Sequence, residues 1–170
     1  MKIKSKDMIL RYFQKKDFND FHKCRNDKEI GRNMFRGTYP LTKKQAKKDF
    51  DHHLKSNKQK NIDAFAITVN NEIVGAISLS EILPKLKAKI GYWIAKDYRN
   101  KGYATKSVKL ICNYGFKKYK LKRIYGNIRT FNKSSVKVLE KAGFKKEGIM
   151  KKNFTKKGKY YDDYLYAKTK

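Results

Sequence analysis

Residues 94–105 read Ile-Ala-Lys-Asp-Tyr-Arg-Asn-Lys-Gly-Tyr-Ala-Thr, a basic segment between two apolar ones. The apolar pattern before it predicts a strand, and apolar side chains recur at roughly helical spacing after it. A helix is therefore expected to begin near Gly102. Backbone N–H groups at a helix N-terminus can hold a diphosphate, and a glycine there lets a ligand approach the backbone. An ordinary strand-to-helix turn uses glycine in the same way, so the spacing alone leaves both interpretations open.

Working outward from this segment, hydrophobic periodicity divides the whole chain into short elements. Strands are predicted at 8–13, 63–69, 72–79, 87–94, 123–129, 144–150 and 160–168, and helices at 17–26, 42–54, 102–118 and 133–142. Asp17 and Thr42 are the expected helix N-caps. Asn70-Asn71 is the expected hairpin turn, and Gly143 ends the last helix. Residues 27–41 are predicted to be irregular.

This order of elements predicts a single domain over residues 1–170. Strands that are interspersed with helices in this way favour the α/β class, with a mixed sheet of about seven strands flanked by about four helices. No internal repeat, linker or low-complexity block divides the sequence.

The composition is strongly basic: 44 Lys and Arg against 15 Asp and Glu give 170 residues a formal charge of +29. High charge is typical of disordered chains, but an aromatic share of 14% indicates a folded core. Three explanations of the charge stay open: RNA binding, an anionic or ribosome-like partner, and a lysine-rich solvated surface. Only seven of the basic residues are Arg, the residue that phosphate- and base-reading sites favour.

Several other classes are excluded by patterns that the sequence lacks. No apolar run approaches the roughly 20 residues of a membrane span, so no membrane contact is expected. The basic N-terminus is not followed by the apolar core of a secretion signal. Cys24 and Cys112 do not form a disulfide framework, and no His or Cys cluster has metal-site spacing. A reduced cytoplasm and no metal are therefore expected.

Taken together, the motifs resemble the GCN5-related N-acetyltransferases (GNAT), and within them the RimJ/RimL-type branch. The motifs that carry the resemblance are Ile90-Gly91-Tyr92-Trp93-Ile94, Tyr98-Arg99-Asn100-Lys101-Gly102-Tyr103-Ala104, Asn132-Lys133-Ser134-Ser135, Val138-Leu139-Glu140-Lys141-Ala142-Gly143-Phe144, Glu147-Gly148 and Tyr161-Asp162-Asp163. The resemblance is strong over residues 88–168 and weak at Leu10-Arg11 and Asp17. It implies the GNAT fold, a largely antiparallel sheet with a V-shaped splay between two central strands, driven by a bulge near Gly91-Tyr92.

The resemblance also implies an activity: acetyl transfer from acetyl-CoA, as co-substrate, to an amine by direct attack in a ternary complex. In this family the Arg-x-x-Gly-x-Ala loop holds the pyrophosphate, a strand backbone pairs with the pantetheine arm, and an Asn hydrogen-bonds that arm. Carried over by motif, the residues expected to bind acetyl-CoA are Ile94, Arg99, Asn100, Lys101, Gly102, Tyr103, Ala104, Thr105 and Asn132.

The catalytic acid departs from the commonest pattern of the family. Many members use a Tyr seven residues after the Asn to protonate the leaving thiolate, and Leu139 stands there. The RimJ/RimL-type branch often has Ser three residues after the Asn, which makes Ser135 the candidate; a role in the first helical turn is the alternative. Glu81 is the candidate general base, and a water chain or a merely solvated carboxylate are the alternatives.

The acceptor is left open by the sequence. A protein N-terminal amine, of the ribosomal-protein-alanine type, is the first choice from the family resemblance, and a small-molecule amine is the second. The high positive charge disfavours polycationic acceptors and permits non-specific contact with RNA. A catalytically silent module that binds RNA or the ribosome is the alternative from a different class. The chain is expected to be a monomer or a homodimer.

Overall fold

The computed structural model describes residues 1–34, 37–56 and 58–170. Its strands are β1 (Lys2–Lys4), β2 (Ile9–Arg11), β3 (Asp63–Val69), β4 (Glu72–Leu83), β5 (Lys87–Ile94), β6 (Arg123–Arg129), β7 (Lys145–Lys156) and β8 (Lys159–Thr169). Its α-helices are α1 (Phe18–Arg25), α2 (Lys28–Asn33), α3 (Lys43–Ser56), α4 (Tyr103–Lys118) and α5 (Lys133–Lys141). Two short 3-10 turns precede α1 and α4, at Lys15–Asp17 and Lys96–Tyr98.

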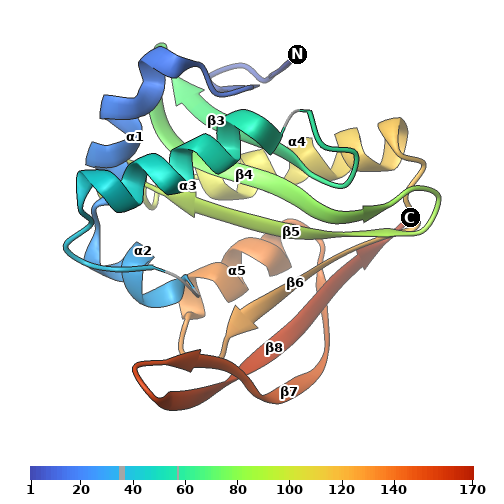
Figure 1. Cartoon of the computed structure of the whole chain (residues 1–170). Coiled ribbons are helices and arrows are strands. Elements are labelled where there is room, and N and C mark those ends of the chain that lie inside the picture. Colours follow the sequence, from blue (N-terminus) through green and yellow to red (C-terminus); the bar gives the residue numbers. More distant parts are fainter. Residues whose placement is uncertain (35–36, 57) are drawn as a thin grey trace.

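The described strands form one sheet in the order β1-β2-β3-β4-β5-β6-β8-β7. Every neighbouring pair in it is antiparallel except β5 and β6, which run parallel. This parallel pair follows from the sequence, because α4 crosses over between the two strands. Figure 1 shows β5 and β6 close together at one end and diverging toward α2 and α5.

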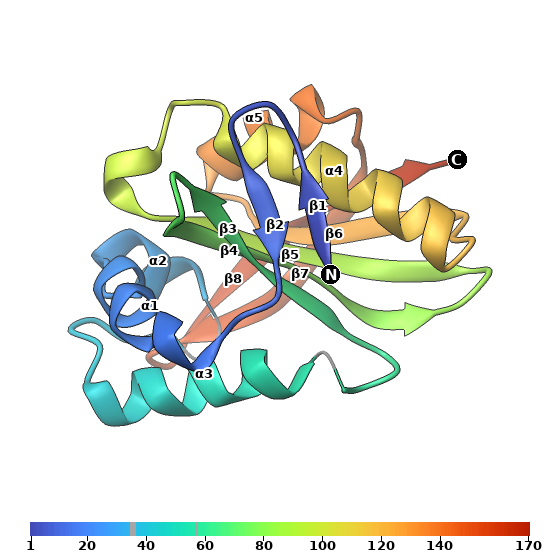
Figure 2. The ribbon, with the colours of Figure 1, turned by 90° about the horizontal axis from the view of Figure 1, so that it is seen from above.

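Helices cover both faces of this sheet (Figure 2). One face packs against α4 and α5 and holds the larger apolar core, to which Ile90 and Ile94 of β5 contribute. The other face packs against α1 and α3, where Trp93 joins a second cluster with Phe21 and Phe50. Side chains along a strand alternate between faces, so the order Tyr92-Trp93 places the tyrosine on the α4 face and the tryptophan on the opposite one.

Most of the predicted elements are confirmed. β3, β5 and β6 have the predicted bounds, because their apolar patterns are bounded by clear turns. Asn70 and Asn71 form the predicted hairpin turn with φ of 50° and 67°. Gly143 ends α5 with φ of 86°, and Thr42 caps α3 with its hydroxyl.

Three expectations near the N-terminus are wrong. The sequence pattern does not predict β1, and the segment predicted to be irregular contains α2, whose N-cap Asp27 accepts a hydrogen bond from the Ile30 amide at 2.8 Å. Asp17 occupies the predicted N-cap position of α1, but its side chain makes no capping hydrogen bond. Its carboxylate instead accepts two hydrogen bonds from the Arg11 guanidinium and one from the Gln14 amide. The Asp17 carboxylate is therefore bound to Arg11, six residues earlier, and not to the amides at the start of α1.

The predicted bulge at Gly91-Tyr92 is also wrong. The register between β4 and β5 runs without interruption from Gly75 opposite Ile94 to Ser80 opposite Lys89. The irregularity lies in β4, between Ser80 and Leu83, where Glu81 has φ of 52°. The left-handed backbone at this irregularity is therefore adopted by a glutamate, although glycine is the residue that adopts it at least cost.

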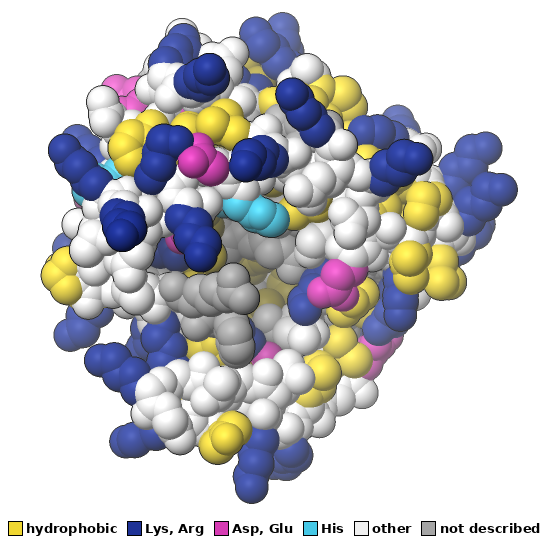
Figure 3. Space-filling model, in the orientation of Figure 1, with side chains coloured by type: hydrophobic (Ala, Val, Ile, Leu, Met, Phe, Trp, Pro, Cys, Tyr) yellow, Lys and Arg dark blue, Asp and Glu magenta, His cyan; other side chains and the backbone are white. Residues whose placement is uncertain are grey.

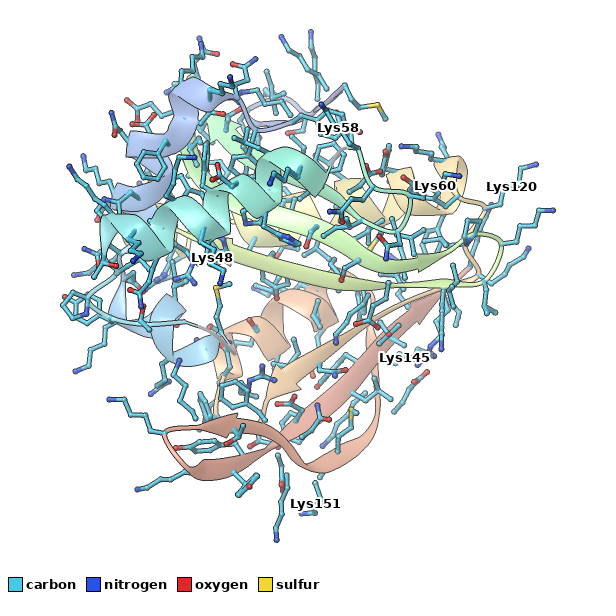
Figure 4. All side chains as sticks on the ribbon, in the orientation of Figure 1. Lys48, Lys58, Lys60, Lys120, Lys145 and Lys151 are labelled. Atoms are coloured by element: carbon cyan, nitrogen blue, oxygen red, sulfur yellow. The ribbon has the colours of Figure 1, made fainter. Side chains whose placement is uncertain are left out.

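The positive charge is distributed over the surface. Figure 3 shows Lys and Arg side chains spread across the α1–α3 face and around its outline. Figure 4 labels six exposed lysines that project from α3, β7 and the connections after α3 and α4: Lys48, Lys58, Lys60, Lys120, Lys145 and Lys151. This spread is typical of a lysine-rich solvated surface. Among the described residues, no helix is long and apolar enough to cross a membrane.

Candidate active site

The turn before α4 presents backbone N–H groups that the protein itself does not use. The amides of Tyr98 and Arg99 bond to carbonyls of the preceding 3-10 turn, and the Lys106 amide bonds to the Gly102 carbonyl at 3.0 Å. Between them, the amides of residues 102–105 have no hydrogen-bond acceptor within the described part of the chain. They are the unsatisfied donors that a helix leaves at its N-terminus.

The same turn has room for a ligand. Gly102 is the N-cap of α4, with φ of 81°, and a Cβ built on it would meet no atom within 4 Å. No acidic side chain lies in the first turn of the helix. Free amides, the positive end of a 16-residue helix and open space together fit a diphosphate group.

A gap in the sheet lies beside this turn. β5 and β6 pair only from Lys87 opposite Arg123 to Lys89 opposite Tyr125, and beyond that point no register joins them. The amide of Ala95 bonds to β4, and backbone groups alternate along a strand, so those of Ile94 point toward the gap. The predicted splay between the two central strands is confirmed, and one edge of β5 is free to pair with an extended chain.

Arg99 ties the turn to α2. Its guanidinium forms ion pairs with Asp27 at 2.6 Å and Glu29 at 2.8 Å, and its Nε donates to the Ile94 carbonyl at 3.3 Å. Burial by itself would raise the pKa of Asp27, but the hydrogen bonds from the Ile30 amide and from Arg99 outweigh it and lower that pKa. The side chain of Arg99 is therefore committed to the protein, and what this loop offers a ligand is its backbone.

The other residues of the predicted cradle surround the free amides. Asn100 has φ of 61°, and the Lys101 ammonium lies 5.3 Å from the centre of the Tyr98 ring. Tyr103 and Ala104 begin α4 and pack against the larger core, with Thr105 following them. The structure thus brings the predicted loop residues together at one helix end.

Asn132 and Ser135 lie at the start of α5. The Asn132 side chain caps this helix: its Oδ1 accepts from the Ser135 amide at 3.2 Å and from the Ser134 hydroxyl at 2.9 Å. Its amide nitrogen remains available as a donor. The Ser135 Oγ has no hydrogen-bond partner among the described residues and is half-buried. Leu139, one turn further on, is fully buried and offers no proton donor.

Tyr92 connects the gap to α5. Its hydroxyl donates to the Ser135 carbonyl at 3.3 Å, and burial raises the pKa of the Tyr92 phenol to about 12. The phenol is therefore protonated at neutral pH. Nothing in the local sequence pattern reveals this contact between residues 43 positions apart.

Glu81 lies on the opposite face of the sheet, beside the point where β5 and β6 part. Its carboxylate accepts from the Tyr125 hydroxyl and from the Lys89 ammonium at 3.2 Å. The Tyr125 hydrogen bond and the Lys89 charge lower the pKa of the Glu81 carboxyl. The side chain is 57% exposed. It is placed where an acceptor could reach it, but it is a weak base.

A buried polar cluster, missed by sequence reasoning, shares this face. Asp163 is fully buried and accepts from the Arg129 guanidinium at 2.5 Å and from the Asn153 amide at 2.9 Å. Among the described residues, Asp163 Oδ1 and Asn127 Oδ1 are buried acceptors without a donor, and Arg129 Nε is a buried donor without an acceptor. Unpaired buried oxygens are costly, so they mark a place where a ligand N–H could bind. The only sequence signal was Asp163 within the Tyr-Asp-Asp motif.

The two sides of the gap offer different chemistry. The α4–α5 face presents backbone amides and the Ser135 hydroxyl, which suit a phosphorylated ligand and a leaving group. The opposite face presents Glu81, Asn127 and Asp163, which suit an amine. Within the described residues, no group of three or more His, Cys, Asp or Glu side chains is arranged to hold a metal ion.

Comparison with known proteins agrees with this geometry. Residues 7–145 match the family model of the acetyltransferase (GNAT) domain, which is most of the chain. The chain therefore belongs to the GNAT acetyltransferases. A relative in Bacillus subtilis (strain 168), the uncharacterized N-acetyltransferase YnaD, is 29% identical over 98% of this chain and 96% of its own length. The spermidine N(1)-acetyltransferase of Escherichia coli (strain K12) is 26% identical over 89% of this chain and 80% of its own.

Solved structures share the fold. RimL, a ribosomal L7/L12 alpha-N-protein acetyltransferase in complex with coenzyme A, superposes with a TM-score of 0.90 over 99% of this chain and 98% of its own, at 22% identity. That identity supports the fold alone. With the family established, the chain is an N-acetyltransferase that takes its acetyl group from acetyl-CoA, and its structural neighbours include RimJ/RimL-type enzymes.

Proposed function

We propose that this enzyme acetylates a primary amine by direct attack within a ternary complex, and that the amine is a protein N-terminus. The observation that carries the proposal is the set of free amides at residues 102–105 beside a gap in the sheet. A donor bound there approaches from the α4–α5 face. An amine approaches from the opposite face, so both substrates can be present at once.

Backbone groups would bind the donor. Acetyl-CoA supplies an acetyl group on a thioester. The amides of 102–105 would hold its diphosphate, and the Ile94 amide on the gap side of β5 would pair with the pantetheine arm as an added strand. The Asn132 amide nitrogen, which the helix cap leaves unused, would donate to the same arm. A backbone N–H of β5 facing the gap would stabilise the negative charge that develops on the thioester oxygen.

Two proton transfers would complete the reaction. The Ser135 hydroxyl would donate a proton or a hydrogen bond to the leaving thiolate, in the place of the tyrosine that Leu139 replaces. On the other face, Glu81 or a water beside it would accept the proton from the amine. The unpaired oxygens of Asn127 and Asp163 would accept hydrogen bonds from the amine and orient it.

The acceptor class rests on charge and on the relatives. A chain with a formal charge of +29 repels a polyamine at long range, although salt screens this beyond about 8 Å. A structural neighbour acetylates a ribosomal protein N-terminus and a sequence relative acetylates spermidine, so both classes lie within the family. A single N-terminal amine fits the charge better, and a small amine is the second choice.

Thiol release from acetyl-CoA tests the proposal with three acceptor sets: peptides that mimic ribosomal protein N-termini, small primary amines, and spermidine. Turnover is expected with peptides, weakly with small amines and least with spermidine at low salt. A spermidine preference at every salt concentration would contradict the acceptor class. Turnover with none of them, together with RNA binding that weakens steeply with salt, would instead support the RNA- or ribosome-binding alternative.

A further inference from the structure

A pocket opens between α2, the β6–α5 connection and the β7–β8 hairpin, apart from the groups assigned above. It has a volume of about 280 Å³. Its described lining residues are Arg32, Phe131, Phe154, Lys156 and Tyr161.

Three aromatic rings form its walls. The rings of Phe131 and Tyr161 meet edge to face, with centroids 5.4 Å apart and planes at 75°. Phe154 and Tyr161 lie 5.9 Å apart at 45°. Phe154 is buried, whereas Phe131 and Tyr161 are half-buried. A further flat group could pack against the exposed parts of these two rings.

The charge in the pocket is positive. The exposed Arg32 guanidinium lies 4.8 Å from the centre of the Phe131 ring, and no carboxylate pairs with it among the described residues. The Lys156 ammonium donates to the carbonyls of Gly31, Met34 and Gly37 at the end of α2. Burial and the nearby charge of Arg25 lower the pKa of Lys156. No acidic side chain is among the described lining residues.

A buried arginine adds to this positive field. Arg25 is 1% exposed, and neither terminal nitrogen of its guanidinium has a hydrogen-bond partner among the described residues. Its only described ion-pair partner is Asp49, at 3.7 Å. The charge of Arg25 is therefore weakly compensated, and it lies close enough to Lys156 to lower the pKa of that ammonium.

The pocket adjoins the acceptor face. The Arg129 guanidinium lies 3.6 Å from the centre of the Phe154 ring, which lines the pocket. Arg129 also pairs with Asp163. The buried polar cluster and the pocket therefore share a wall, so an amine held at the cluster would leave the rest of its molecule near the pocket.

We propose that this pocket binds a flat, negatively charged group of the acceptor, stacked against Phe131 and Tyr161 and paired with Arg32. The inference rests on the proposed function and narrows it: the preferred acceptor is a primary amine that carries an aromatic ring and a carboxylate. A polyamine offers neither group and would be repelled. Such an acceptor is a small molecule or the start of a peptide, and the test separates the two.

Four amines used as acceptors separate the effect of an aromatic ring on kcat/KM from the effect of a second charge. Propylamine has neither, benzylamine has the ring, 4-(aminomethyl)benzoate adds an anion, and 1,4-bis(aminomethyl)benzene adds a cation. The expected order of kcat/KM is the benzoate above benzylamine, with propylamine and the diamine below, and at least tenfold between the two charged probes. The difference is expected in the KM of the amine and not in that of acetyl-CoA. Equal kcat/KM for the two charged probes would overturn the inference while leaving the proposed function intact.

Charge reversal sharpens the test. Arg32→Glu should invert the order of the two charged probes. Lys28→Glu makes the same change of charge on the exposed surface of the same short helix, outside the described pocket lining, and should keep the order. If both variants shift the order equally, only the overall charge of the protein matters and the pocket is not the site.

Inhibition and peptides supply independent readouts. 4-Methylbenzoate, which lacks the amine, should compete with the acceptor and not with acetyl-CoA, and Arg32→Glu should weaken it at least tenfold. If 4-methylbenzoate does not compete with the acceptor, ligand binding at this pocket is contradicted. This result does not require that any of the four amines is acetylated. The peptides Ala-Phe-Glu-Gly and Ala-Phe-Lys-Gly identify the source. If kcat/KM is higher with Ala-Phe-Glu-Gly than with 4-(aminomethyl)benzoate, the acceptor is a protein N-terminus. If kcat/KM is higher with the benzoate, the acceptor is a small molecule.

Discussion

The turn before α4 and the face between β6, β8 and α2 form the two halves of the proposed site, but they are built differently. The turn offers backbone amides from consecutive residues, and its one special requirement is a glycine with φ of 81°. The acceptor face offers side chains from strands and helices far apart in the sequence, such as Arg129 with Asp163. A backbone site suits a donor shared by a whole family, whereas a side-chain site can differ from one enzyme to the next.

The largest effect is expected at the turn. Gly102→Glu places a carboxylate and a left-handed non-glycine residue where the diphosphate would lie, so kcat/KM for acetyl-CoA should fall at least 100-fold. Gly158 is the matched control, because it also has positive φ, at 74°, and a Cβ added to it would meet no atom within 4 Å. Gly158→Glu carries the same strain and charge in the β7–β8 turn. Steady-state kinetics in which both variants lose activity equally would contradict the special role of the turn.

The second-largest effect is expected at Asp163, where a substitution tests whether the acceptor face also stabilises the fold. Asp163→Ala removes a fully buried carboxylate from the Arg129 guanidinium, whose side chain is 15% exposed, and this should lower the free energy of unfolding by about 3–5 kcal/mol. Glu147→Ala breaks the exposed pair with Arg123 and should cost about 1 kcal/mol or less. Urea denaturation of both variants measures the difference. Equal losses would mean that the buried pair contributes no more than a surface pair.

A smaller effect is expected at Ser135. Ser135→Ala removes the free hydroxyl and should lower kcat about tenfold or more while the affinity for CoA stays the same. Ser134→Ala is the matched control, since it removes the neighbouring hydroxyl that only bonds to Asn132. A normal kcat in Ser135→Ala would mean that Ser135 takes no part in catalysis and serves only as a residue of the first turn of α5.

The smallest effect is expected at Glu81. Its pKa is lowered, so the carboxylate is charged throughout the neutral range and contributes no inflection to activity between about pH 6 and 9. The rise of activity with pH should instead follow deprotonation of the acceptor amine. Glu81→Gln should therefore lower kcat a few-fold at every pH without moving the curve. A shifted acidic limb in the pH–rate profile would show that Glu81 titrates in the working range.

The features that were predictable from the sequence are the local ones. β3, β5, β6, the turn at Gly102 and the end of α5 at Gly143 each depend on a few consecutive residues. α2 escaped prediction because its six residues include Gly31 and form no long apolar stripe. Glycine is the usual residue at a bulge and therefore pointed to Gly91, yet the chain bends at Glu81.

The rest of the site depends on contacts between distant residues. Tyr92 meets Ser135, Glu81 meets Tyr125, and Arg129 meets Asp163 across 43, 44 and 34 positions. Such contacts are decided by strand order and register, which a single sequence does not reveal. The pocket beside Phe131 likewise exists only after the β7–β8 hairpin folds against α2.

The central claim is that the free amides opening α4 receive the diphosphate of the donor. The most direct test follows backbone amide resonances of ¹⁵N-labelled protein during titration with CoA. The account predicts that the amides of Gly102, Tyr103, Ala104 and Thr105 move most and saturate together, while that of Gly158 does not move. Saturable binding that leaves these four amides unchanged and moves others instead would contradict it.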